Sequence, residues 1–128
     1  MTSLLSKTLI LLLAINSFSV YSMQIREKAP AFSLISNSGE KVSLRDYKNK
    51  IIVLEWFNKG CPFVKKFYES GEMQKWQKKY AKRGVIWLTI SSSAEGKQGF
   101  ESVKEVKKTR ENWKINSTFN LLDHEGIA

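Results

Sequence analysis

The residue best suited to chemistry in this sequence is its single cysteine, Cys61. It follows the apolar run Ile51–Phe57 and directly precedes Pro62, a residue that favours the first position of a helix. The free N–H groups and the positive dipole end of such a helix favour a thiolate, and Lys59 and Lys65 add positive charge in the sequence around it. We therefore predict that Cys61 is a reactive nucleophile. The alternative is a buried cysteine that packs as a small apolar side chain.

The elements that must position this thiol follow from the hydrophobic pattern. Ile51–Phe57 and Val85–Ile90 are continuous runs rich in β-branched and aromatic residues, which is typical of buried strands in a parallel sheet. Between them, two apolar stripes at helical spacing are separated by Ser70 and Gly71. The pattern predicts two adjacent parallel strands joined by a helical crossover, with Cys61 where the first strand meets the helix.

The flanking segments complete an α/β fold with an N-terminal hairpin followed by a βαβα unit. We predict an edge strand over Lys28–Leu34, a turn at Ser36–Gly39 and a second strand over Lys41–Leu44. Downstream, the pattern indicates a loop over 91–99, a helix over Phe100–Trp113 and a further strand beginning at Asn120.

Composition bounds the class of protein. The chain has 128 residues, of which 42% are hydrophobic and 26% charged, which fits one globular domain. One cysteine and one histidine exclude an internal disulfide and a Cys/His zinc site, and the sequence predicts no metal or cofactor. The histidine, His124, is predicted to be a surface turn residue.

The first 22 residues have the layout of a secretory signal peptide. Lys7 precedes the apolar run Leu9–Ile15, and small residues follow before the predicted cleavage site after Ser22. We expect a mature domain over 23–128 in the periplasm or outside the cell, without an integral membrane span after cleavage. The alternative is a retained N-terminal anchor, although seven apolar residues are short for one.

Basic residues exceed acidic ones by 21 to 12, a formal net charge of +9. They are spread along the predicted helices, which is typical of solvated helix faces. Binding to nucleic acid or to an anionic surface is the alternative, and the sequence shows no groove-reading or base-stacking motif. We therefore predict no nucleic-acid partner.

The order of strand, Cys61-Pro62, helix, strand and helix resembles the thioredoxin-like superfamily. More narrowly, the sequence resembles the redoxin branch known as the alkyl hydroperoxide reductase/thiol-specific antioxidant (AhpC/TSA) family. The resemblance spans about 28–126, and its most similar segments are Lys28–Phe32, Val53–Lys66, Val85–Ser93 and Gly96–Gly99. It implies thiol chemistry at Cys61 with an oxidoreductase or antioxidant role in redox homeostasis.

The resemblance also suggests a role for Glu55. In thioredoxins a buried acid at the matching position moves protons for the thiols. The alternative is that Glu55 points away from the sheet and pairs with a lysine, because strand alternation alone does not fix its side.

The sequence departs from both related motifs. Thioredoxins have Cys-x-x-Cys, where this chain has Val64 in place of the second cysteine. Peroxiredoxins have Pro-x-x-x-Thr-x-x-Cys, where this chain has Leu54 and Asn58 before Cys61. Members of this kind also use an arginine, for which Arg83 and Arg110 are the candidates.

Thioredoxin-like domains continue with a cis-proline loop, a hairpin and a helix, which this sequence lacks. We therefore expect an incomplete domain whose Ile51–Phe57 strand forms an exposed apolar sheet edge and promotes self-association.

These observations predict an exported thiol oxidoreductase that reduces a disulfide or a peroxide through Cys61. With one cysteine, it would need an external thiol or a thioredoxin-like reductant as partner. The alternative is a catalytically weak redoxin-like binding module or a non-functional fragment.

Overall fold

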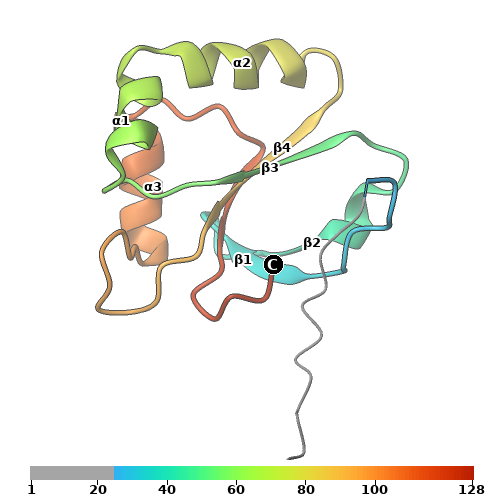
Figure 1. Ribbon diagram of the computed structural model, residues 1–128, viewed down its shortest axis with the longest axis horizontal. Helices are drawn as coiled ribbons and strands as arrows, with labels where there is room; N and C mark the ends of the chain where they lie inside the picture. Colours follow the sequence, from blue (N-terminus) through green and yellow to red (C-terminus); the bar gives the residue numbers. More distant parts are fainter. Residues whose placement is uncertain (1–24) are drawn as a thin grey trace, which may run out of the picture.

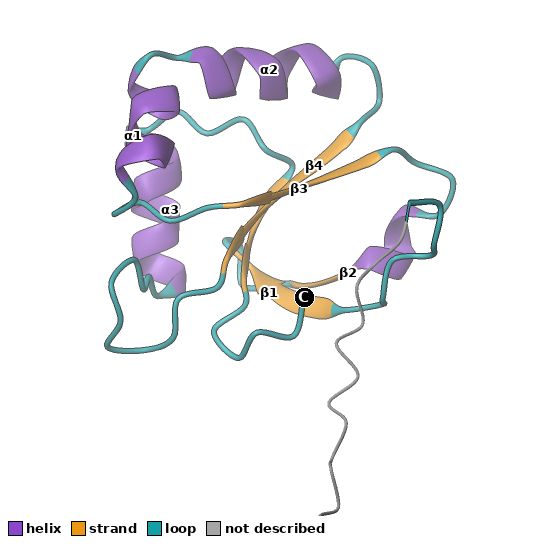
Figure 2. Cartoon of the chain, in the orientation of Figure 1, coloured by secondary structure: helices purple, strands orange, loops and turns teal. Residues whose placement is uncertain are grey.

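Five strands form one mixed sheet in the computed structural model, which describes residues 25–128 (Figure 1). Their spatial order is β2-β1-β5-β4-β3. The strands are β1 (Ser33–Ser36), β2 (Lys41–Ser43), β3 (Ile52–Trp56), β4 (Ile86–Ser91) and β5 (Phe119–Leu122). The helices are a short 3-10 turn (Leu44–Tyr47), α1 (Pro62–Glu69), α2 (Glu72–Ala81) and α3 (Val103–Asn112), as Figure 2 shows.

The predicted pair of adjacent parallel strands that leads into Cys61 is confirmed. Strands β3 and β4 run parallel, with Ile52 opposite Ile86 and Trp56 opposite Ile90. Helices α1 and α2 form the crossover, and the chain turns between them at Gly71, whose φ of 76° is the left-handed conformation that glycine adopts at little cost. Because both strands point the same way, their carboxyl ends lie at one edge of the sheet.

The N-terminal hairpin is present, but its first strand is not at the edge. Strand β1 begins at Ser33 rather than Lys28, since Pro30 has no N–H to donate to a ladder. It pairs with β2 on one side, and on the other with β5 through Ile35 and Leu122. The prediction of an edge strand was wrong, because the returning strand β5 covers β1; the edges of the sheet are β2 and β3.

The two faces of the sheet differ in polarity. One face carries Leu54, Leu88 and Leu121, which pack with the hairpin residues Phe32 and Val42 as the main apolar core. The registers of β3, β4 and β5 place Glu55, Thr89 and Asn120 in one row on the opposite face. Side chains from all three helices bond to this polar row, so the helices cover it.

The residues predicted to form the signal peptide, 1–22, lie outside the described part of the chain. Within 25–128, none of the helices is both long enough and apolar enough to cross a membrane.

Candidate functional site

Cys61 lies where the sequence predicted it, at the N-cap of α1 just after the end of β3. Its backbone is extended (φ −75°, ψ 123°), and Pro62 occupies the first helical turn. The Cys61 N–H donates to the Asn58 carbonyl at 3.0 Å, and the Cys61 carbonyl accepts from the Lys65 N–H at 3.0 Å. The thiol is half-buried and does not cap the helix. It is therefore held beside the free N–H groups of α1 while solvent can still reach it.

Asn58 ties the segment before the thiol, Asn58–Cys61, to the loop that follows β4. Its Oδ1 accepts the Gly60 N–H at 2.8 Å. Its Nδ2 donates to the side chain and backbone carbonyls of Gln98 at 3.1 and 3.3 Å, and to Ser93 Oγ at 3.4 Å. One side-chain amide thus fixes the turn into α1 and joins it to a loop about forty residues later.

Two glycines make this contact sterically possible. A Cβ at Gly60 would lie 2.0 Å from Gln98 Nε2, and a Cβ at Gly99 would lie 2.3 Å from Asn58 Oδ1. Gly99 also has a φ of 87°, a conformation that other residues rarely adopt. We call the four residues Asn58, Gly60, Gln98 and Gly99 the clasp.

A first prediction separates the contribution of the clasp to folding stability from the effect of backbone strain. Gly96 and Gly99 lie in the same loop with φ values of 74° and 87°, but only a Cβ at Gly99 would meet another residue. Both alanine variants lose about 1 kcal/mol from the strained φ. Gly99→Ala is expected to lose about 1–2 kcal/mol more, because the Asn58 hydrogen bonds break, and to alkylate faster at Cys61. Chemical unfolding and iodoacetamide kinetics measure both effects; equal results for the two variants would refute the clasp.

Lys59, which the sequence analysis expected to add positive charge around the thiol, forms an ion pair with a buried acid. Its ammonium lies 3.3 Å from Oε1 of Glu101, a carboxylate that is only 1% exposed. Thr109 Oγ1 also donates to Glu101 Oε1, while the buried Oε2 has no hydrogen-bond partner in the structure. Burial of a carboxylate is costly without a cation close by, so the ion pair with Lys59 stabilises Glu101 in its buried position. The same ion pair offsets the positive charge of Lys59. Lys65, by contrast, lies exposed on α1.

Glu55 faces the helices rather than a lysine, which settles the direction that strand alternation left open. Oε1 accepts from Tyr68 Oη at 2.8 Å, and Oε2 accepts from Trp87 Nε1 at 2.7 Å and Gln77 Nε2 at 3.1 Å. Gln77, fully buried, also donates to Tyr68 Oη at 2.8 Å and accepts the Asn116 N–H at 2.8 Å. We call Glu55, Tyr68, Gln77 and Trp87 the polar network.

The two candidate arginines are engaged elsewhere. Arg110 Nη1 donates to Ser117 Oγ at 2.9 Å and to Asn120 Oδ1 at 2.6 Å, and Nη2 donates to the Ser117 carbonyl. Burial lowers the pKa of Arg110 below its usual value. Arg83 lies over the ring of Tyr80, 5.7 Å from its centroid. Neither guanidinium makes a contact with Cys61 in the structure.

A second prediction follows from the environment of Tyr68. Burial, and then the negative charge of Glu55, raise the pKa of this phenol well above its usual value of 10.0. The neutral phenol is favoured in the folded state, so its contribution to stability is complete below pH 10 and is lost as the pH rises further. The stability difference between the wild type and Tyr68→Phe should shrink by up to about 1.4 kcal/mol per pH unit above pH 10. The difference for Val106→Ala, a buried apolar control, should stay constant.

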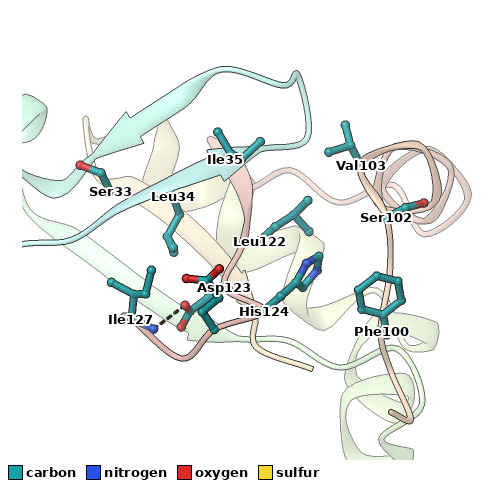
Figure 3. Close-up of a pocket in the computed structure, with 11 residues that line it drawn as sticks. Ser33, Leu34, Ile35, Phe100, Ser102, Val103, Leu122, Asp123, His124 and Ile127 are labelled. Carbon is teal, nitrogen blue, oxygen red and sulfur yellow. Dashed lines mark hydrogen bonds between the residues drawn. The ribbon is translucent and has the colours of Figure 1, made fainter. Parts of the chain in front are cut away.

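A surface pocket of about 460 Å³ lies between β1, the segment Phe100–Val103 and the segment after β5, as Figure 3 shows. Two of its polar side chains, those of Asp123 and His124, have partners within the chain. The Asp123 carboxylate accepts the N–H of Ile127 at 2.6 Å, and His124 Nε2 lies 3.1 Å from the Glu101 carbonyl. The His124 ring also stacks on Phe100, with centroids 4.6 Å apart. His124 is half-buried and structural, and Cys61 does not line this pocket.

Nowhere in residues 25–128 do three or more His, Cys, Asp or Glu side chains come together as a metal site would require.

Comparison with known proteins agrees with this arrangement. Residues 25–126 match the AhpC/TSA family. The chain belongs to this family. It is 32% identical over 117 residues to the thioredoxin-like protein YneN of Bacillus subtilis, covering 88% of the chain and 64% of that protein.

The solved structures similar to this AhpC/TSA member include several thioredoxin-family proteins. An uncharacterized conserved protein from Geobacillus kaustophilus is 27% identical with a TM-score of 0.68, covering 77% of the chain and 51% of that protein. The thioredoxin domain of a thiol-disulfide oxidoreductase from Bacteroides vulgatus is 22% identical with a TM-score of 0.60, covering 82% and 68%. The fold is thioredoxin-like, and the chain spans 64% of its Bacillus relative and about half of the Geobacillus protein.

The sequence analysis placed Cys61 at the start of a helix, but it missed the side chains that hold Cys61 and Glu55 in position. The signals were present: Gln77 lies between the apolar residues of the α2 stripe, and a glycine precedes Cys61. Their partners Asn116 and Gln98 come from distant segments that no local pattern connects.

Proposed function

We propose that this chain carries out thiol–disulfide exchange through Cys61. The observation that carries the proposal is the half-buried thiol at the N-cap of α1, at the carboxyl edge of a parallel strand in a thioredoxin-like fold. The free N–H groups of the first helical turn lie beside this thiol. The family and the Bacteroides thiol-disulfide oxidoreductase with the same fold support this class of reaction.

The reaction needs two thiols. The Cys61 thiolate attacks one sulfur of a substrate disulfide, the substrate S–S bond breaks, and the other substrate sulfur leaves as a thiolate that takes up a proton. Cys61 is then in a mixed disulfide. Because the chain has no second cysteine, an external thiol attacks the substrate sulfur of that bond, which releases the Cys61 thiolate and joins the substrate sulfur to the external thiol. A second external thiol then attacks the external sulfur of this new bond, so that the substrate leaves as a thiol and the two external thiols end as a disulfide. The substrate gains two electrons, which the external thiols supply.

A disulfide substrate suits this site better than a peroxide. Asn58, at the position of the peroxiredoxin threonine, uses its side chain in the clasp. Arg110 and Arg83 are engaged with β5 and with Tyr80. The groups that would orient a peroxide at the thiol are therefore committed to other contacts.

Glu55 is the proposed proton-transfer residue. Its carboxylate lies under the helix that Cys61 begins, because Tyr68 of that helix donates to it. In the Glu55→Gln variant the pH dependence of the exchange rate should change. An unchanged pH profile in a folded variant would assign Glu55 a structural role alone.

The predicted signal peptide at 1–22 supports a site of action outside the cytoplasm. An oxidising compartment supplies disulfide substrates, and it makes a thiol donor necessary for turnover. A thioredoxin-like reductant is the proposed donor.

The test has two steps. With oxidised glutathione the wild-type chain should form one glutathione adduct by mass spectrometry, which reduced thiol then removes. With dithiothreitol as donor it should accelerate insulin reduction over many turnovers, and Cys61→Ser should do neither. An active Cys61→Ser variant overturns the proposal, and an adduct that external thiols cannot release favours the binding module.

A further inference from the structure

Helix α2 and the turn after it present a face with five basic side chains and one acidic side chain, Glu72, at the N-terminal end of the helix. Five basic side chains line one shallow surface hollow of about 570 Å³. We call this set the α2 basic face; it consists of Lys75, Lys78, Lys79, Lys82 and Arg83.

The α2 basic face points away from the rest of the protein. Gln77 is fully buried, and Met73 and Tyr80 are half-buried against the sheet and α1. Helical periodicity places Lys75, Lys79 and Lys82 on the opposite side of α2. Figure 1 shows α2 along the rim of the molecule, so that no other element covers this side.

The positive charge of this face is balanced only in part within the described residues, by Glu72. The stretch from Met73 to Val85 contains no acidic residue. Glu72 lies 3.7 Å from Lys75, and the remaining four cations make no ion pair with the residues that the structure describes. Lys79 and Arg83 lie over the ring of Tyr80, at 5.5 and 5.7 Å from its centroid. These contacts hold like charges together, so that a bound anion would relieve their repulsion.

Helix α3 provides the contrast. It also has three exposed lysines, which are Lys104, Lys107 and Lys108. Glu105 and Glu111 lie among them on the same helix. The charges of α3 are therefore more nearly balanced than those of α2, and α3 serves as an internal control.

We propose that the α2 basic face docks onto a membrane surface that carries anionic lipid headgroups. A helix that lies along the rim of the molecule is accessible to a flat surface. Trp76 lies on α2 among these cations and is 53% exposed, and an amphipathic indole ring suits the headgroup level of a bilayer. Basic residues beside an exposed aromatic are typical of helices that lie on such surfaces. The inference is independent of the reaction at Cys61.

The test is sedimentation with vesicles of phosphatidylcholine, with and without phosphatidylglycerol. Neutral vesicles measure binding that does not need charge, including any through the apolar run Leu9–Ile15. Binding to anionic vesicles should fall with salt. The triple variant Lys78→Gln, Lys79→Gln, Lys82→Gln should bind about 100-fold more weakly. The matched variant Lys104→Gln, Lys107→Gln, Lys108→Gln should bind nearly as the wild type does.

Tryptophan fluorescence tests whether the contact with the membrane lies on α2. Quenching by brominated lipid should be smaller in Trp76→Phe than in Trp56→Phe, a control that removes another half-exposed tryptophan. Equal losses in the two triple variants would show an effect of net charge alone and overturn the proposal. Absence of binding to anionic vesicles would overturn it as well. So would tighter α2-dependent binding to a single-stranded oligonucleotide, which would make the face a nucleic-acid site.

Discussion

A Val64→Cys variant is expected to resolve its own mixed disulfide. Val64 lies three residues after Cys61 in the first turn of α1. Residues at this spacing are neighbours on one helix face, and the change creates the Cys-x-x-Cys spacing of a dithiol site. The second thiol would attack within the molecule, so the glutathione adduct should disappear about 100-fold faster than with external thiol alone. Quenched mass spectrometry gives this rate.

The stability of this variant and a double variant serve as its controls. Val64 packs beside Phe57 and Tyr68, so its replacement should cost only about 1 kcal/mol of folding stability. The double variant Cys61→Ser, Val64→Cys retains one thiol at the new position, and it should exchange slowly because that thiol is within α1. Rapid adduct formation by this double variant would show that the N-cap position of Cys61 is not what makes it reactive.

The Gln77→Ala variant is expected to lose about 3 kcal/mol of unfolding free energy. The Gln77 side chain is fully buried and bonds to Glu55, Tyr68 and the Asn116 backbone. Its removal leaves these groups short of partners in a space that water enters poorly, and it also leaves a cavity. Denaturant unfolding measures the loss.

The neighbouring residue supplies the control for this experiment. Lys78 follows Gln77 on α2 but is exposed, so Lys78→Ala should change stability by less than about 0.5 kcal/mol. A Gln77→Ala variant as stable as Lys78→Ala would mean that water replaces the amide, and that the polar network contributes little to the fold.

The parts of the fold that local pattern determines could be predicted. The apolar runs at Ile51–Phe57 and Val85–Ile90 predicted strands β3 and β4, and Ser70-Gly71 predicted the break between α1 and α2. The position of Cys61 at a helix start followed from Pro62. These signals lie within a few residues of the features that they predict.

What the sequence did not predict depends on partners distant in the chain. Glu55 points to the side of the sheet where it accepts hydrogen bonds from Gln77 and Trp87. These residues lie 22 and 32 positions further along the chain. The compensation of Lys59 by Glu101 likewise crosses β4 and the following loop. Such pairs follow from the register of the sheet, which a single sequence does not reveal, and the strand at Lys28–Leu34 was misplaced for the same reason.

The clasp has a consequence for how events at a distance reach the thiol. The Gly60 amide hydrogen is bonded to the same Asn58 side chain that holds Gln98. It can exchange with deuterium only when its hydrogen bond to Asn58 Oδ1 breaks. A molecule that pulls Gln98 outward would therefore speed Gly60 exchange without touching Cys61. The rate of deuterium exchange at this one amide therefore measures how often the Asn58–Gly60 hydrogen bond opens. Comparing this rate with and without a molecule bound to the 91–99 loop shows whether that molecule changes the opening.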